Sequence, residues 1–243
     1  MSPTRTMRRS DPPAEAVRDV LKNLPRTDRL DMRGGSVHYV LVLGSPWDDL
    51  VGIDLASGSL IRLRVPWSQA NPPDLSAFDV VEASLAADPE TDDLAHPEAA
   101  TVSRLPRLIG SLRGRAIKQI LSRVQAPLDG PLLGFRGPSA PFWEFDGTRP
   151  STALVVPTRG PQLLRRHEDL STWVRFGWER DDVWLRCEDS AASRALDAAR
   201  REMLSGKELA TALGFKPSYL LASLSRPYDG HCYKICVGLL PRS

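Results

Sequence analysis

WVRFGWERDDVWLRC, residues 173–187, is the clearest β-hairpin pattern in the chain. Apolar and polar residues alternate along both arms, and Arg180-Asp181-Asp182 supplies the turn. Side chains of a strand point alternately to its two faces, so one face of this hairpin is expected to join the core. The other face then gathers two tryptophans and two arginines, a composition suited to stacking bases and pairing phosphates. Purely structural packing of tryptophan on arginine is the alternative. These four residues are Trp173, Arg175, Trp184 and Arg186.

The chain on both sides of the hairpin is also rich in strand signals. Turn dipeptides recur at Gly137-Pro138, Asp146-Gly147 and Gly160-Pro161, with no helical periodicity between them. Residues 127–189 are therefore expected to form an antiparallel meander.

Residues 14–126 are expected to form a helix followed by five short strands and a second helix. The strands are compatible with a small closed or half-closed barrel, including the oligonucleotide-binding (OB) type. Ser111 is predicted to cap the second helix, whose outer face is basic and can meet phosphates or simply face solvent. Residues 1–13, polar and basic, are expected to be a flexible tail. The predicted strands are 37–43, 50–55, 60–65, 78–87 and 99–105, and the basic residues are Arg113, Arg115, Lys118 and Arg123.

Residues 190–243 are expected to form a helical module. A helix is predicted from Ser190 to Leu204, and the span from Gly206 to Leu224 places a small Ala210 and a turn-forming Gly214 among regularly spaced leucines. This span resembles the helix-turn-helix motif, and the segment after it resembles the wing of winged-helix proteins. The resemblance implies contact with DNA or, equally, with protein. It implies a third helix, the recognition helix, beginning near Pro217, with Lys216, Tyr219 and Arg226 among the residues that bind.

Length and composition restrict the class of protein. The 243 residues are 42% hydrophobic, which is enough for one large or two modest domains. No apolar run approaches the roughly 20 residues of a membrane-spanning helix, and the first 33 residues contain no signal-peptide pattern. Three cysteines do not make a disulfide framework. We therefore expect a cytoplasmic protein that does not enter a membrane.

Charge is unevenly distributed although the net charge is only +2. Residues 74–98 contain eight acidic residues and no basic ones, whereas residues 101–136 contain seven basic residues and one acidic one. Such blocks can create local fields, or they can neutralise each other in space.

Residues for catalysis, metal binding or cofactor binding are not predicted. The four histidines lie far apart, and Cys232 and Cys236 lie too far apart on one strand to share a zinc ion. The segment from Glu144 to Thr148 resembles the motif of haloacid-dehalogenase-type phosphatases, but Glu144 replaces the required aspartate, and a hairpin turn at Asp146-Gly147 is the better explanation.

The sequence thus predicts an α+β protein with barrel-like β regions and a C-terminal winged-helix-like module. The leading function is non-enzymatic binding of single-stranded or duplex DNA or RNA, by phosphate contacts and aromatic stacking. One alternative is an adaptor that docks a protein partner through the acidic segment 88–98 or through the C-terminal module. A second alternative is an enzyme whose site is assembled from scattered residues.

Overall fold

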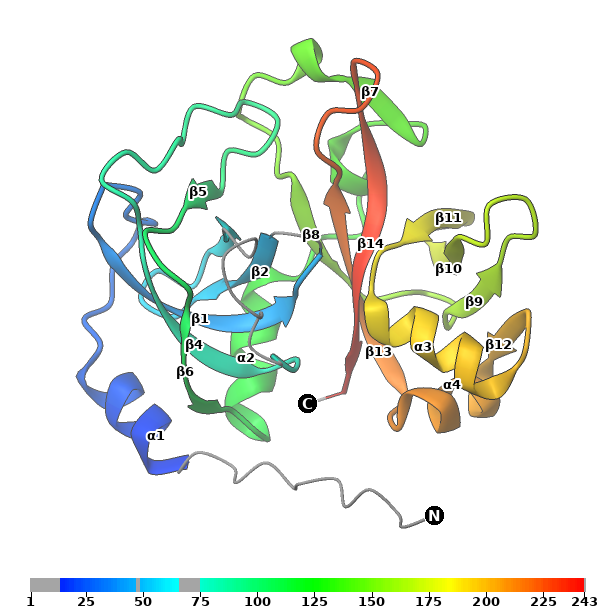
Figure 1. Cartoon of the computed structure of the whole chain (residues 1–243), viewed down its shortest axis with the longest axis horizontal. Coiled ribbons are helices and arrows are strands. Elements are labelled where there is room, and N and C mark those ends of the chain that lie inside the picture. Colours follow the sequence, from blue (N-terminus) through cyan, green and yellow to red (C-terminus); the bar gives the residue numbers. More distant parts are fainter. Residues whose placement is uncertain (1–13, 47–48, 66–74, 243) are drawn as a thin grey trace, which may run out of the picture.

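The computed structural model describes residues 14–46, 49–65 and 75–242. In this part of the chain two β-sheets pack against each other, and four α-helices are distributed around them (Figure 1). The fold is mostly β, and the predicted α+β arrangement with a C-terminal helical module is wrong.

The first sheet is formed by the N-terminal half of the chain. Its strand order is β5-β3-β2-β1-β4-β6, and all neighbours are antiparallel except the parallel pair β3 and β5. The predicted strands at 37–43, 50–55 and 60–65 are confirmed. The strands are β1 (Val37–Gly44), β2 (Asp49–Asp54), β3 (Leu60–Arg64), β4 (Asp79–Ser84), β5 (Ala99–Thr101) and β6 (Arg107–Ser111).

This sheet is curled but does not form the predicted OB-like barrel. A single bridge links Leu85, just after β4, to Val102, just after β5. Further closure is prevented because the free edge of β4 is already occupied by β6, which pairs with it over Asp79–Glu82. No closed barrel is present among the described residues.

The second sheet is formed by the C-terminal half of the chain. Its order is β12-β9-β10-β11-β14-β13-β8, and the short strand β7 also pairs with β14. Strands from the predicted meander and from the predicted helical module therefore share one sheet. They are β7 (Ser139–Pro141), β8 (Thr152–Val155), β9 (Gln162–Arg165), β10 (Thr172–Trp178), β11 (Asp181–Cys187), β12 (Met203–Ser205), β13 (Pro217–Leu224) and β14 (His231–Pro241).

The helices cover the sheets at separate places. Helix α1 (Ala14–Asn23) packs on β6, α2 (Arg115–Val124) lies near β8, and α3 (Ser190–Ala199) and α4 (Gly206–Leu213) pack together beside β9 and β12 (Figure 1). Two 3-10 turns, at Leu132–Gly134 and Phe142–Glu144, lie in the central connection. Among the described residues no helix is long and apolar enough to cross a membrane.

The start of α2 differs from the prediction. The residue at its N-cap is Gly114, with φ of 71°, and no side chain caps this end. Ser111 is instead the last residue of β6. Its hydroxyl donates a hydrogen bond to Oδ1 of Asp79 at 2.5 Å.

The predicted recognition helix near Pro217 is strand β13. Tyr219 and Leu221 point into the core between the two sheets, whereas Leu220, Ala222 and Leu224 point into the core on the far side of the second sheet. An apolar run that is buried on both faces shows no alternation, and periodicity cannot distinguish it from a buried helix. A helix-turn-helix is therefore not formed here.

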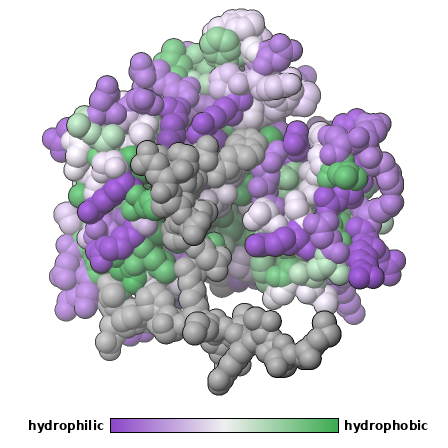
Figure 2. All heavy atoms as spheres, viewed as in Figure 1, coloured by the Kyte–Doolittle hydropathy of each residue, from purple (hydrophilic) through white to green (hydrophobic). Residues whose placement is uncertain are grey.

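Strands β13 and β14 run through the middle of the molecule, between the two lobes of Figure 1. The core between the sheets joins Leu41 and Ile53 of the first sheet to Leu221 and Val237 of the second. On the face seen in Figure 1, hydrophilic side chains cover much of both lobes (Figure 2). The two sheets thus form one body with a shared apolar interface.

A buried ion pair within the first sheet also has contacts with the second. Nε of Arg62 on β3 lies 2.7 Å from Oδ2 of Asp49, and each side chain is only 1% exposed. Nη1 of Arg62 donates to the carbonyl of Leu224 on β13 at 2.9 Å, and Arg226 approaches the other oxygen of Asp49 at 2.9 Å. Because a buried charge without a partner is costly, this network fixes how the two sheets meet.

Arg62→Met tests the buried pair. The free energy of unfolding is expected to fall by about 3 kcal/mol, because Asp49 stays buried and keeps only Arg226 as a cationic partner in the described structure. Urea denaturation followed by tryptophan fluorescence measures the change. Arg107→Met is the matched control. Arg107 is 68% exposed and Glu82 keeps Arg104 as a partner, so the substitution is expected to cost less than about 1 kcal/mol. Equal losses in both variants contradict the role given to Arg62.

Candidate nucleic-acid interface

The hairpin formed by β10 and β11 has the predicted register. Trp173 lies opposite Arg186, and Arg175 lies opposite Trp184. On the other face, Val174 and Leu185 are part of the core. The indole of Trp184 is 46% exposed, and Trp173 is half-buried, so the two tryptophans lie at the surface.

The two indoles line a hollow of about 460 Å³. Its other walls come from the end of β9 and the turn after it, because β9 pairs with β10 and sets Leu164 opposite Trp173. The lining residues are Leu164, Arg165, Arg166, His167, Glu168, Trp173 and Trp184.

Arginine guanidinium groups lie over both indoles. Cζ of Arg166 is 5.8 Å from the ring centroid of Trp173, and Cζ of Arg175 is 5.4 Å from that of Trp184. Nε1 of Trp173 donates to the hydroxyl of Ser171 at 2.8 Å, which fixes the orientation of this ring. The hollow therefore combines oriented aromatic surfaces with cations at their faces.

Carboxylates neutralise part of this positive charge. Arg175 pairs with Asp182 at 2.6 Å, Arg166 with Glu168 at 2.6 Å, and Arg186 with Glu188 at 2.8 Å. The hydrogen bond from Arg175, helped by the charge of Arg159, holds the pKa of Asp182 below its usual value. Glu168 is 74% exposed, and since exposed ion pairs contribute only about 0–1 kcal/mol, a phosphate can replace this carboxylate at little cost.

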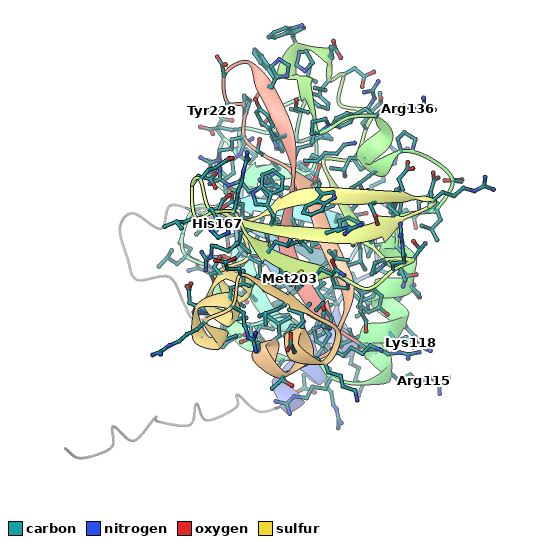
Figure 3. The ribbon with its side chains drawn as sticks, turned by 90° about the vertical axis from the view of Figure 1, so that its right-hand side faces the viewer. Arg115, Lys118, Arg136, His167, Met203 and Tyr228 are labelled. Carbon is teal, nitrogen blue, oxygen red and sulfur yellow. The ribbon has the colours of Figure 1, made fainter. Side chains whose placement is uncertain are left out.

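The basic helix lies at a different place. Arg113, Arg115, Lys118 and Arg123 are exposed. Figure 3 shows Arg115 and Lys118 on α2 at one side of the view, and His167, which belongs to the hollow, at the opposite side. These two basic regions do not form one continuous site around the hollow.

The candidates from the C-terminal segment are scattered. Lys216 is exposed just before β13, but Tyr219 is only 9% exposed and packs in the core between the sheets. Arg226 pairs with the buried Asp49. Tyr219 is therefore mostly withdrawn from solvent, and the recognition helix on which its predicted role depends is replaced by β13.

Sequence reasoning missed Arg165, Arg166 and His167, which complete the hollow. Arg165 is the last residue of β9, and Arg166 and His167 follow it. The pairing of β9 with β10 places them beside the tryptophans. The run of three basic residues directly after an apolar pair, Leu163-Leu164, was the available signal.

Among the described residues no group of three or more histidine, cysteine, aspartate or glutamate side chains could hold a metal ion.

Comparison with family models, with curated proteins and with solved structures gives no match for this chain.

A larger cavity of about 1020 Å³ lies on the other side of Trp184. Phe135, Trp178 and Lys234 contribute to its walls. Its lining also includes four carboxylates against two cations, Arg136 and Lys234, and this excess of negative charge opposes the binding of a polyanion there. The carboxylates are Asp129, Glu179, Asp181 and Asp182.

Lys234 is a buried cation in the wall of this cavity. It is 8% exposed, its Nζ donates to the carbonyl of Phe135 at 2.5 Å, and it lies 3.9 Å from the centroid of the Phe135 ring. Burial lowers the pKa of Lys234 to about 8. The folded state therefore binds fewer protons than the unfolded state between pH 8 and the ordinary lysine pKa of about 10.5, and stability gains from rising pH in that window.

Lys234→Met is expected to raise the free energy of unfolding by about 2 kcal/mol at pH 7, because it removes a buried charge and keeps the aliphatic chain. The difference in the free energy of unfolding between the variant and the wild type is expected to shrink from pH 8 upward and to vanish near pH 10.5. Urea denaturation at several pH values measures this difference. Lys216→Met, at an exposed lysine, is the control, and a pH-independent gain in Lys234→Met contradicts the assignment.

Proposed function

We propose that the protein binds single-stranded nucleic acid, without catalysing a reaction on it, at the hollow between Trp173 and Trp184. The guanidinium groups of Arg166 and Arg175 move from the indole faces to the neighbouring phosphates, and a base stacks on the indoles in their place. The proposal places the protein in the cytoplasm, which agrees with three free, buried cysteines, Cys187, Cys232 and Cys236.

The observation that carries the proposal is the pair of surface indoles with guanidinium groups over their faces. Tryptophan is costly to expose, and an exposed aromatic pair in a hollow is typical of a binding surface. Base stacking on aromatic side chains contributes about 1–3 kcal/mol per base and tolerates any sequence.

Single strands fit this surface better than duplex. Bases in a duplex are already stacked and present only their edges, whereas the indole faces need an unstacked base. A recognition helix for the major groove is also absent from the described C-terminal segment, where β13 takes its place. The acidic cavity beyond Trp184 limits the strand to the β9 side of this residue.

The adaptor alternative has less support. Within the acidic segment 88–98, Glu90 and Asp93 both pair with Arg64, and Asp93 also accepts a hydrogen bond from His96. Burial would raise the pKa of Asp93, but the hydrogen bond and charge of His96, together with Arg64, lower it well below its usual range. Part of the acidic segment 88–98 is therefore engaged in contacts within the protein rather than free to bind a partner.

Trp184→Ala tests the stacking. We expect the affinity for a fluorescein-labelled oligothymidylate to fall about ten-fold, equivalent to about 1.4 kcal/mol, because one stacked base is lost. Fluorescence anisotropy at low salt measures it. Trp143→Ala removes another exposed tryptophan, 66% exposed and outside the hollow, and is expected to leave binding unchanged. Absence of binding by the wild type at low salt, or equal losses in both variants, rejects the proposal.

The salt dependence identifies the phosphate contacts. Each contact contributes a slope of about −0.7 to a plot of log K against log salt for a single strand. Arg166→Met is expected to reduce the slope by about that amount, since Arg166 lies at the hollow. Arg115→Met on α2 is expected to leave it unchanged. If the slope is reduced only in Arg115→Met, the phosphate contacts lie on α2 and the proposed site is wrong.

A further inference from the structure

Three side chains of the first sheet form a hydrogen-bonded row. Ser36 directly precedes β1 and His38 is the second residue of this strand, so the two are two residues apart in extended chain and their side chains lie on the same face. Oγ of Ser36 is 2.9 Å from Nε2 of His38, and Nδ1 of His38 is 3.1 Å from Oδ1 of Asp54 at the end of β2. The row connects a hydroxyl, an imidazole and a carboxylate through the atoms that link a serine nucleophile, its general base and an orienting carboxylate.

The carboxylate end of the row is fixed and buried. His38 is 4% exposed and Asp54 is 2% exposed. The second oxygen of Asp54 accepts hydrogen bonds from the backbone N–H and the hydroxyl of Ser57, at 2.8 and 2.7 Å. Burial alone would raise the pKa of Asp54, but the hydrogen bonds from His38 and Ser57 outweigh burial and lower it. Asp54 is therefore ionised near neutral pH.

An ionised Asp54 determines the tautomer of a neutral His38. The carboxylate accepts from Nδ1–H, which leaves the lone pair of Nε2 directed at the hydroxyl of Ser36. Ser36 is only half-buried, so the nucleophile end of the row is the end that a reagent can reach.

We propose that Ser36 is a nucleophile toward activated carboxylic esters, with His38 as its general base and Asp54 as the residue that positions His38. Oγ of Ser36 bonds to the carbonyl carbon while its proton moves to Nε2 of His38. The bond to the leaving alkoxide then breaks, and the alkoxide takes that proton from His38. Water attacks the acyl-serine by the same proton route, which releases the carboxylic acid and restores Ser36.

The surroundings of Ser36 predict a slow reaction. The backbone N–H groups of Gly35 and Ser36 donate to the carbonyls of Ala86 and Arg33, each at 3.1 Å, so neither is available to a developing oxyanion. The loss of one oxyanion donor slows acyl transfer by about 10²–10³-fold. The carbonyl of Asp31 also accepts from the Ser36 hydroxyl, at 3.1 Å, and competes with His38 for its proton. Stoichiometric acylation is therefore the readout, rather than rapid turnover.

This activity is independent of nucleic-acid binding. Ser36, His38 and Asp54 belong to the first sheet, and the tryptophan hollow belongs to the second. Substitutions in the row are expected to leave oligonucleotide binding unchanged.

The test is covalent labelling of the full-length protein with an alkyl fluorophosphonate, in which a bond from Oγ to phosphorus forms and fluoride leaves. Intact-mass measurement and peptide mapping give the site and the rate. We expect one adduct, on Ser36, that forms at least 100-fold faster than any adduct on the exposed Ser103 of the same molecule. Ser36→Ala is expected to abolish it, and p-nitrophenyl acetate is expected to acylate the same residue.

The contribution of the base and the carboxylate is tested by His38→Gln and Asp54→Asn. Each is expected to slow labelling of Ser36 at least ten-fold and to leave labelling of Ser103 unchanged, at a temperature where circular dichroism shows that the variant is folded. In wild type, the Nδ1–H of His38 is expected to give a far-downfield proton NMR signal that Asp54→Asn removes. If a variant fails to fold, the proposal is judged from the wild type alone, by the labelling rate of Ser36 relative to that of Ser103. No adduct on Ser36, or labelling no faster than at Ser103, overturns the proposal.

Discussion

Burial of β13 and β14 on both faces is the constraint from which most of the structure follows. Ile235 and Val237 of β14 fill the core between the sheets, while Cys232 and Cys236 fill the core on the far side. A shift of register by one residue would exchange the two sets, and both cores would be disrupted. The alternation also requires Lys234, which lies on the same face as Cys232 and Cys236, to sit inside the protein, where a carbonyl and an aromatic ring replace water around its ammonium group.

Two-sided burial also explains which elements could be predicted from the sequence. The hairpin at 173–187 was predictable because one of its faces is apolar and the other polar, so the alternation is visible. Strand β13 was not predictable, because its residues are buried on both sides and its pattern equals that of a buried helix. The prediction of a barrel was wrong for a different reason. Sequence shows that strands exist but not that β6 occupies the edge of β4 that closure requires.

The candidate site was predictable to the extent that it lies within one hairpin. The facing of Arg175 and Trp184 follows from local register alone. Arg166 and His167 reach the hollow only through the pairing of β9 with β10, and the row of Ser36, His38 and Asp54 requires two strands to meet. Such contacts depend on tertiary pairing, which no local pattern in this sequence specifies.

Arginine content alone carries no functional information here, because the environment decides what each guanidinium group can do. Arg62 and Arg64 both alternate with apolar residues on β3, yet Arg62 is 1% exposed and held by Asp49 and by the carbonyl of Leu224. A ligand could recruit Arg62 only by leaving Asp49 buried and poorly paired, at a cost of several kcal/mol. Arg166 is 51% exposed and its partner Glu168 is 74% exposed, so Arg166 can exchange this partner for about the energy of one surface ion pair. Availability for binding therefore follows from the cost of releasing the existing partner, and by this criterion the arginine over Trp173 is available, whereas the arginine between the sheets is committed to the fold.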